Sequence, residues 1–194
     1  MHSTYETTPR ALRTSADVLR ATVLGTVPIA LFSDSAEGAV RLLVVFLALL
    51  IPRIARLPEP VDFAVCVALS LATFASVFNW YRDVMWLDWM VHAVTTGTLA
   101  LTVFVLLLRA AWTPEGHQFS GAAVVVQVAF LGATLGVVWE LYELSVGTFT
   151  AVRIAVGYGD TIADLAMGVL GSILAGVALA AALRDPHRTT VGRR

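Results

Sequence analysis

Six long apolar segments constrain the fold of this 194-residue chain more than any other feature. A helix that crosses the hydrocarbon core of a bilayer needs about 20 mostly apolar residues. The segments cover residues 17–33, 39–57, 61–78, 87–108, 122–146 and 161–183. The sequence therefore predicts an all-α, polytopic integral membrane protein, a bundle of about six transmembrane helices. Residues 1–16 and the basic residues 184–194 are expected to be tails.

The composition agrees with a membrane protein. The chain is 58% hydrophobic and only 14% charged, and its mean hydropathy is +0.79, whereas a soluble domain carries about 25% charged residues. The net charge of −1 gives no reason to expect nucleic acid as a partner. The single cysteine, Cys66, excludes an internal disulfide and a cysteine-based metal site.

The arginines divide unevenly between the two sets of connecting segments. All 13 basic residues are arginine, and one set of tails and loops holds Arg10, Arg13, Arg20, Arg53, Arg56, Arg109, Arg184, Arg188, Arg193 and Arg194. The other set holds only Arg41, Arg82 and Arg153. Because arginine-rich segments stay on the cytoplasmic side, we expect a multi-pass protein of the bacterial inner membrane with both termini in the cytoplasm.

Three of the apolar segments each carry two ionisable residues about one helical turn apart. The pairs are Asp88 with His92, Glu140 with Glu143, and Asp160 with Asp164. Such groups are costly inside a membrane and usually mark a functional site. The expected topology places all three pairs at the outer ends of their helices, with the deeper members roughly 5–10 Å below the interface. Small residues continue the same helix faces, so we expect these faces to pack together.

Five carboxylates and one imidazole in one place need compensation by a metal, by protonation, or by pairing with Arg82 and Arg153. Carboxylates with one histidine suit Zn, Mn, Fe or Mg, while a single histidine argues against a haem held by two histidines and against the di-iron bundle pattern. The predicted metal ligands are Asp88, His92, Glu140, Glu143, Asp160 and Asp164. The deeper three, Glu140, His92 and Asp164, are the candidate catalytic groups. Arg153 and Arg82 are candidates for holding an anionic substrate.

Simpler roles stay open at these positions. Asp160 is suited to cap a helix, Asp88 and Arg153 suit the membrane interface, Glu143 is close enough to the helix end to reach water, and His92 could be a partner of Asp88 alone. The function stays open as well. The leading hypothesis is a metal-dependent hydrolase or transferase that acts on a membrane lipid, a lipid-linked envelope precursor or a small amphiphile. The alternatives are an ion- or proton-coupled transporter and a non-catalytic subunit or assembly factor bound to other membrane subunits.

Two stretches carry a resemblance to known families. The run LDWMVHAVTTG, and later WELYEL followed by GYGDTIADLAMGVLGSILAG, resemble the YjdF-like family of bacterial inner-membrane proteins and, more distantly, VanZ-like membrane proteins. The resemblance covers about residues 80–180 and places the ionisable pairs on the family's polar positions. Trp89 stands where the families often have Lys or Arg, and Leu144-Ser145 replaces a tryptophan-rich segment. The resemblance thus implies a fold and a place for the site, but no reaction.

Overall fold

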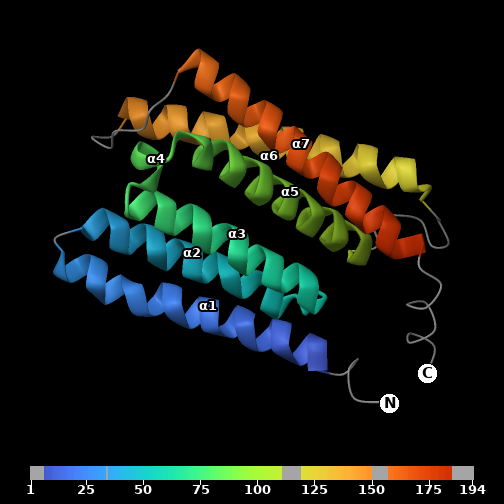
Figure 1. The fold of residues 1–194 in the computed structure, drawn as a ribbon, viewed down its shortest axis with the longest axis horizontal. Coiled ribbons are helices and arrows are strands. Elements are labelled where there is room, and N and C mark those ends of the chain that lie inside the picture. Colours follow the sequence, from blue (N-terminus) through green and yellow to red (C-terminus); the bar gives the residue numbers. More distant parts are fainter. Residues whose placement is uncertain (1–6, 34, 111–118, 150–156, 185–194) are drawn as a thin grey trace. The chain divides into compact units, whose positions relative to one another are not determined.

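The computed structural model describes residues 7–33, 35–110, 119–149 and 157–184, and within these ranges the chain forms helices and no strands (Figure 1). The elements are α1 (Thr7–Phe32), α2 (Ala36–Ile54), α3 (Glu59–Val77), α4 (Trp80–Asp83), α5 (Met85–Arg109), α6 (Gly121–Phe149) and α7 (Tyr158–Arg184). The all-α prediction is confirmed.

Five of these helices, α1, α3, α5, α6 and α7, are long and apolar enough to cross a membrane. The expected segment 39–57 is also helical, as α2, but this helix carries Glu37, Arg41 and Arg53 within 19 residues. Glu37 and Arg41 form an ion pair one turn apart near its start. The described residues therefore contain five candidate spans, and the sixth stays a prediction.

Two helices begin earlier than their hydropathy suggests. α1 begins at Thr7 rather than at residue 17, so the part of the expected tail from Thr7 onward is helical. Pro9 fits there because the first turn of a helix does not use its backbone N–H groups internally. α7 begins at Tyr158 rather than at residue 161, and its first turn is closed by the bond from Thr161 N–H to the Gly157 carbonyl at 2.9 Å.

The chain forms two compact units that divide after Leu87. In the first unit, α1, α2 and α3 lie side by side and alternate in direction, joined by short connections (Figure 1). Their shared core contains Val23, Leu42, Leu49 and Val65, each 2% exposed or less.

A buried arginine ties the three helices of this unit together. Arg20 of α1 is 5% exposed, and its Nε donates to the Leu49 carbonyl of α2 at 2.9 Å. Its terminal nitrogens donate to Asp17 of α1 at 3.0 Å and to Asp62 of α3, which is 4% exposed. A buried guanidinium and carboxylate are tolerated when they neutralise each other and fill their hydrogen bonds. Arg20 meets this condition with three partners.

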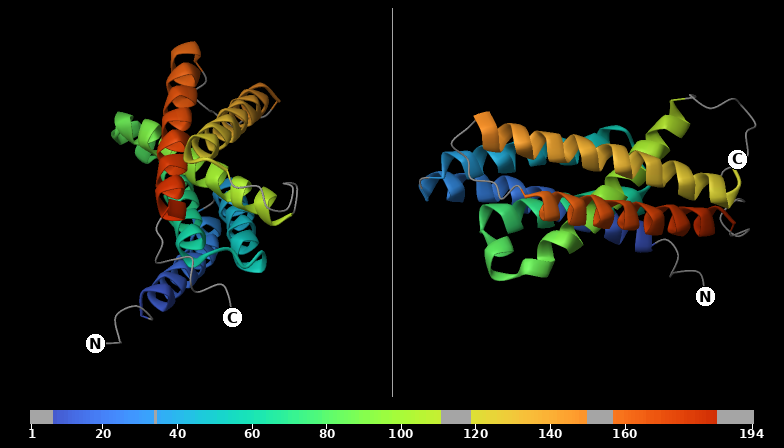
Figure 2. Two further views of the ribbon diagram at one scale, coloured as in Figure 1. Left: turned by 90° about the vertical axis from the view of Figure 1, so that its right-hand side faces the viewer. Right: turned by 90° about the horizontal axis from the view of Figure 1, so that it is seen from above.

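The second unit contains α5, α6 and α7, and α6 and α7 run in opposite directions along each other (Figure 2). Its core contains Phe104 of α5, Val124 and Val128 of α6, and Ala180 of α7. This apolar cluster lies toward the end of α5 and α7 and the start of α6, so it leaves the opposite ends of these helices for polar residues.

Glycines set the distance between these helices. A Cβ on Gly171 of α7 would overlap the Ala93 carbonyl of α5, and one on Gly97 of α5 would lie 2.5 Å from the Gly171 carbonyl oxygen. On α6, a Cβ on Gly132 would overlap the side chain of Ser172. Backbones in membranes approach closely where residues are this small. The prediction that the small-residue faces pack together is confirmed.

This packing predicts different outcomes for two glycines of the same helix. We expect Gly171→Ala to lower the stability of the protein by about 1–3 kcal/mol, because the added methyl group forces α5 and α7 apart. Gly159→Ala is the matched control, since nothing lies within 4 Å of the position a methyl group would take there. Thermal unfolding in detergent checks the difference, and equal midpoints for the two variants would contradict the close contact.

The buried ion pair makes a second prediction. Asp62→Leu leaves Arg20 without its buried carboxylate and is expected to lower stability by about 3–5 kcal/mol. The double variant Arg20→Met/Asp62→Leu removes both charges and is expected to recover most of this loss. Unfolding midpoints of the single and double variants measure the coupling. A double variant as unstable as Asp62→Leu alone would show that the pair is not the source of the stability.

Candidate functional site

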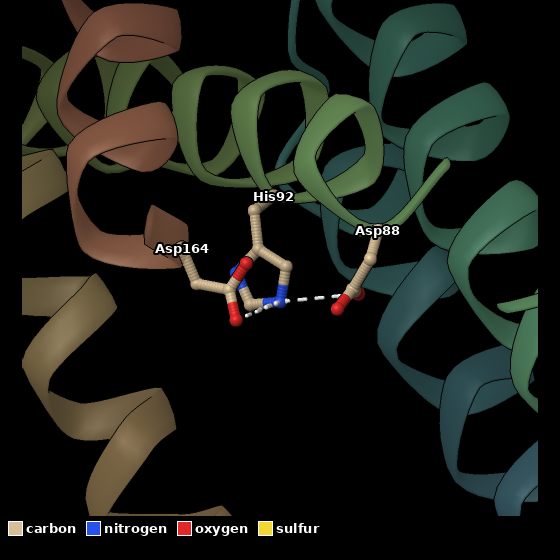
Figure 3. Close-up of side chains that lie close together, drawn as sticks. All are labelled: Asp88, His92 and Asp164. Atoms are coloured by element: carbon tan, nitrogen blue, oxygen red, sulfur yellow. Dashed lines mark ion pairs between the residues drawn. The ribbon is translucent and has the colours of Figure 1, made fainter. Parts of the chain in front are cut away.

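Three of the six predicted ligands come together in the second unit. They are Asp88 and His92 of α5 and Asp164 of α7 (Figure 3). One ligand atom from each residue lies within 4.8 Å of the other two. The Nε2 atom of His92 lies between the carboxylates, 3.6 Å from Asp88 Oδ1 and 3.8 Å from Asp164 Oδ2. We call these three residues the Asp-His-Asp group.

The helix contact one turn away explains why these side chains meet. Thr96 follows His92 by four residues, and Gly168 follows Asp164 by four residues, so each lies on the same helix face as its partner. A Cβ on Gly168 would lie 3.2 Å from Thr96 Oγ1. Because α5 and α7 touch at Thr96 and Gly168, the preceding turns place His92 and Asp164 opposite each other.

The spacing suits ligands of a shared cation better than a hydrogen-bonded cluster. Neither the 3.6 Å nor the 3.8 Å separation from His92 Nε2 is short enough for a good hydrogen bond. Zinc binds histidine nitrogen and carboxylate oxygen at about 2.0–2.2 Å, so two ligand atoms of one tetrahedral or octahedral ion lie about 3.0–3.6 Å apart. The two separations from His92 Nε2 lie at or just above this range, and the three ligand atoms as a set lie within 4.8 Å of one another.

Asp164 is the most buried member of the group. It is 3% exposed, whereas the side chains of His92 and Asp88 are 13% and 31% exposed. Its Oδ1 atom is buried and has no hydrogen-bond partner among the described residues. A buried carboxylate oxygen without a partner is costly, and such an atom in a folded protein calls for an explanation. A bound cation would supply the missing partner.

The other three predicted ligands are close enough to act electrostatically on the group but do not belong to it. Glu140 and Glu143 of α6 and Asp160 of α7 are partly buried, and their charges act on Asp164. Asp160 lies in the first turn of α7 rather than at the N-cap position, where its charge suits the positive end of the helix dipole. Metal binding by these three acids stays a prediction.

The described residues do not place either of the two arginines predicted to contact the substrate in the Asp-His-Asp group. Arg82 is an exposed residue of α4, in the first unit. Arg153 lies outside the described residues. Their role in holding an anionic substrate also stays a prediction.

Asp88 is the residue whose place in the site is least evident from the sequence. Its position in the first turn of α5 is typical of an interfacial residue or a helix-stabilising acid. The signal that could have selected it is its four-residue spacing from His92, which puts both side chains on one face. The depth of Glu140 in its helix suggested that it would join His92 and Asp164. Among the described residues, Asp88 stands in that place instead.

Comparison with known proteins identifies the family of this chain. A family model with the description 'Predicted membrane protein (DUF2238)' matches residues 18–185. The chain belongs to this family, which is the YjdF-like family, so that expectation from the sequence is confirmed. The match includes α5, α6 and α7, where the Asp-His-Asp group lies. No curated protein and no solved structure matches the chain.

The geometry predicts an unusual effect of removing the buried charge. Asp164→Asn is expected to raise the stability of the chelator-treated protein by roughly 1–2 kcal/mol, because it removes one negative charge from a cluster of carboxylates. Unfolding midpoints in detergent with excess chelator test this, and Asp83→Asn, an exposed aspartate of α4, is the control. A clear loss of stability in Asp164→Asn would instead show that Asp164 and His92 form a structural ion pair.

Proposed function

We propose that this protein is a membrane metalloenzyme in which the Asp-His-Asp group holds one divalent cation and acts on a lipid or lipid-linked substrate. The observation that carries the proposal is the unpartnered Oδ1 of Asp164, buried beside a histidine nitrogen and a second carboxylate at ligand spacing. Family membership supports a membrane protein; the metal and the reaction are inferred from the residues.

Charge balance favours a divalent ion. The two aspartates contribute two negative charges, which one divalent cation cancels, so the cation with its three ligands carries no net charge in a medium that penalises charge. One imidazole and two carboxylates suit Zn, Mn, Fe or Mg. Three protein ligands leave at least one coordination position open, and catalytic metal sites keep such a position for water or substrate.

A bound cation at this place would polarise a phosphoryl or carbonyl oxygen of the substrate, or lower the pKa of a bound water molecule. Glu140, outside the ligand-spaced group but on the neighbouring helix, is the proposed general base. Glu143 and Asp160 are proposed as further ligands or as groups that hold the site's water. Arg153 and Arg82 are proposed to hold an anionic head group, because a guanidinium binds phosphate oxygens in pairs.

The depth of the group suits a lipid substrate. Asp88 and His92 lie in the first two turns of α5, so His92 is about 10 Å from the start of that helix. This depth corresponds to the boundary between head groups and acyl chains. With α2 as a sixth span, the arginine distribution puts both termini in the cytoplasm and the group on the outer side of the bacterial inner membrane. The distant VanZ-like resemblance fits the same placement.

The packing below the group favours a fixed site over a transport path. Gly97, Gly171 and Ala93 bring the α5 and α7 backbones into contact from the residue after His92 to about one and a half turns beyond it. On the α6 side, the Ser172 side chain fills the space against Gly132 and donates its hydroxyl to the Gly168 carbonyl at 2.8 Å. A water path for ions along this interface would have to open these contacts.

The test is metal content per chain after loading purified protein with Zn, Mn, Fe or Mg salts. We expect about one equivalent of one of these metals in the wild type and at least roughly tenfold weaker binding in His92→Ala and in Asp164→Asn. Asp83→Asn is the control for a lost surface charge. Glu140→Gln is expected to keep the metal, because this residue is assigned to proton transfer rather than to metal binding.

The outcomes separate the proposal from its alternatives. A wild type that takes up none of the four metals, or a His92→Ala variant that binds metal as the wild type does, would overturn the metalloenzyme. Loss of the metal in Glu140→Gln would transfer Glu140 from the role of base to that of ligand.

A further inference from the structure

A charged cavity of about 380 Å³ lies in the first unit, where α2 ends and α3 begins. Its polar lining comes from Arg13 of α1, Arg53 of α2, Arg56 in the turn between α2 and α3, and Glu59 and Asp62 of α3. The ends of membrane-spanning helices lie at the level of the lipid head groups. Basic pockets between helices at this level suit anionic head groups.

Among the described residues, the lining of the cavity and its immediate surroundings contain more arginines than carboxylates. The ionisable residues there are Arg13, Arg20, Arg53 and Arg56 against Asp17, Glu59 and Asp62. Asp62 is bound by the buried Arg20, and Asp17 is shared between Arg20 at 3.0 Å and Arg53 at 3.2 Å. Among these described residues, four arginines stand beside three carboxylates, so the lining offers guanidinium groups suited to phosphate oxygens.

The backbone of Arg56 is a second and independent observation. Its φ angle is 51°, in the left-handed region. It follows the end of α2, where the Leu57 N–H bonds back to the Pro52 carbonyl at 2.9 Å. This turn usually has glycine at the left-handed position, because other residues are strained there. A strained residue at the edge of a charged cavity points to a role for its side chain.

We propose that this cavity binds the phosphate group of an anionic phospholipid, held by the guanidinium groups of Arg13, Arg53 and Arg56. Guanidinium groups match phosphate oxygens in pairs of hydrogen bonds. The volume lies in the range of small-molecule sites and has room for a phosphate with its glycerol. The site lies in the first unit, and its ligand does not depend on the metal or on the reaction proposed for the Asp-His-Asp group.

The experiment measures how lipids change the unfolding midpoint of the full chain in detergent. Phosphatidylglycerol, phosphatidylcholine and inorganic phosphate are added separately to the wild type and to Arg13→Gln, Arg56→Gly and Arg10→Gln. Arg10→Gln is the matched control, because Arg10 is exposed on the same helix as Arg13 but does not line the cavity. Native mass spectrometry of bound lipid gives the affinities.

We expect phosphatidylglycerol to stabilise the wild type more than phosphatidylcholine does. Arg13→Gln and Arg56→Gly should each bind phosphatidylglycerol about fivefold more weakly, while Arg10→Gln binds it as the wild type does. Arg56→Gly also separates binding from folding. Glycine relieves the left-handed strain, so this variant should be as stable as the wild type, or more so, without added lipid.

The remaining outcomes decide the source of the phosphate or overturn the proposal. Arginine-dependent stabilisation by inorganic phosphate as strong as that by phosphatidylglycerol would support the phosphate site and identify its ligand as soluble phosphate. Equal losses of phosphatidylglycerol binding in Arg10→Gln and Arg13→Gln would overturn the proposal in favour of diffuse surface charge. Unchanged binding in Arg13→Gln and Arg56→Gly would also overturn it.

Discussion

The cost of an unpaired charge in an apolar medium is the constraint on which both units of this protein depend. In the first unit the chain itself supplies the partners of the buried charge, since Arg20 donates hydrogen bonds to Asp17, Asp62 and the Leu49 carbonyl. In the second unit the described residues leave one buried group unsatisfied, because Asp164 Oδ1 has no hydrogen-bond partner among them. One unit therefore has a complete ion pair, while the other keeps a buried carboxylate oxygen without a partner among the described residues, and the proposed cation site rests on this oxygen.

The close contact of α5 with α7 fixes the position of this buried carboxylate relative to His92. Without side chains at Gly97 and Gly171, the two backbones touch, and the Thr96–Gly168 contact fixes which turns face each other. Tight packing at this level holds the carboxylate of Asp164 a few ångströms from His92. Ligands held by rigid elements bind a metal with little reorganisation, which is a requirement for a precise site.

The sequence predicts the helices well because a long run of apolar residues indicates directly that a segment is suited to cross a membrane. It misplaces their ends because polar residues beyond the membrane continue a helix without changing its hydropathy, as in the first turns of α1 and at Tyr158 of α7. The site shows a similar limit. Spacing along one helix pairs Asp88 with His92, but only the rotation of one helix against another decides whether Asp88 or Glu140 reaches the group. The Arg20–Asp62 pair joins residues 42 positions apart, and no local pattern reveals it.

The division of the Asp-His-Asp group between two helices has a mechanical consequence. In the proposed site α5 contributes two ligands and α7 only one, so a cation bound by all three would join these helices at one end while the glycine contacts hold them further along. Binding free energy for the ion then includes the free energy of bringing the two ends together. A ligand that separates the end of α7 from α5 would release the ion without unfolding the core around Phe104 and Val128. If the proposed cation binds, its retention would thus report the distance between these two helix ends.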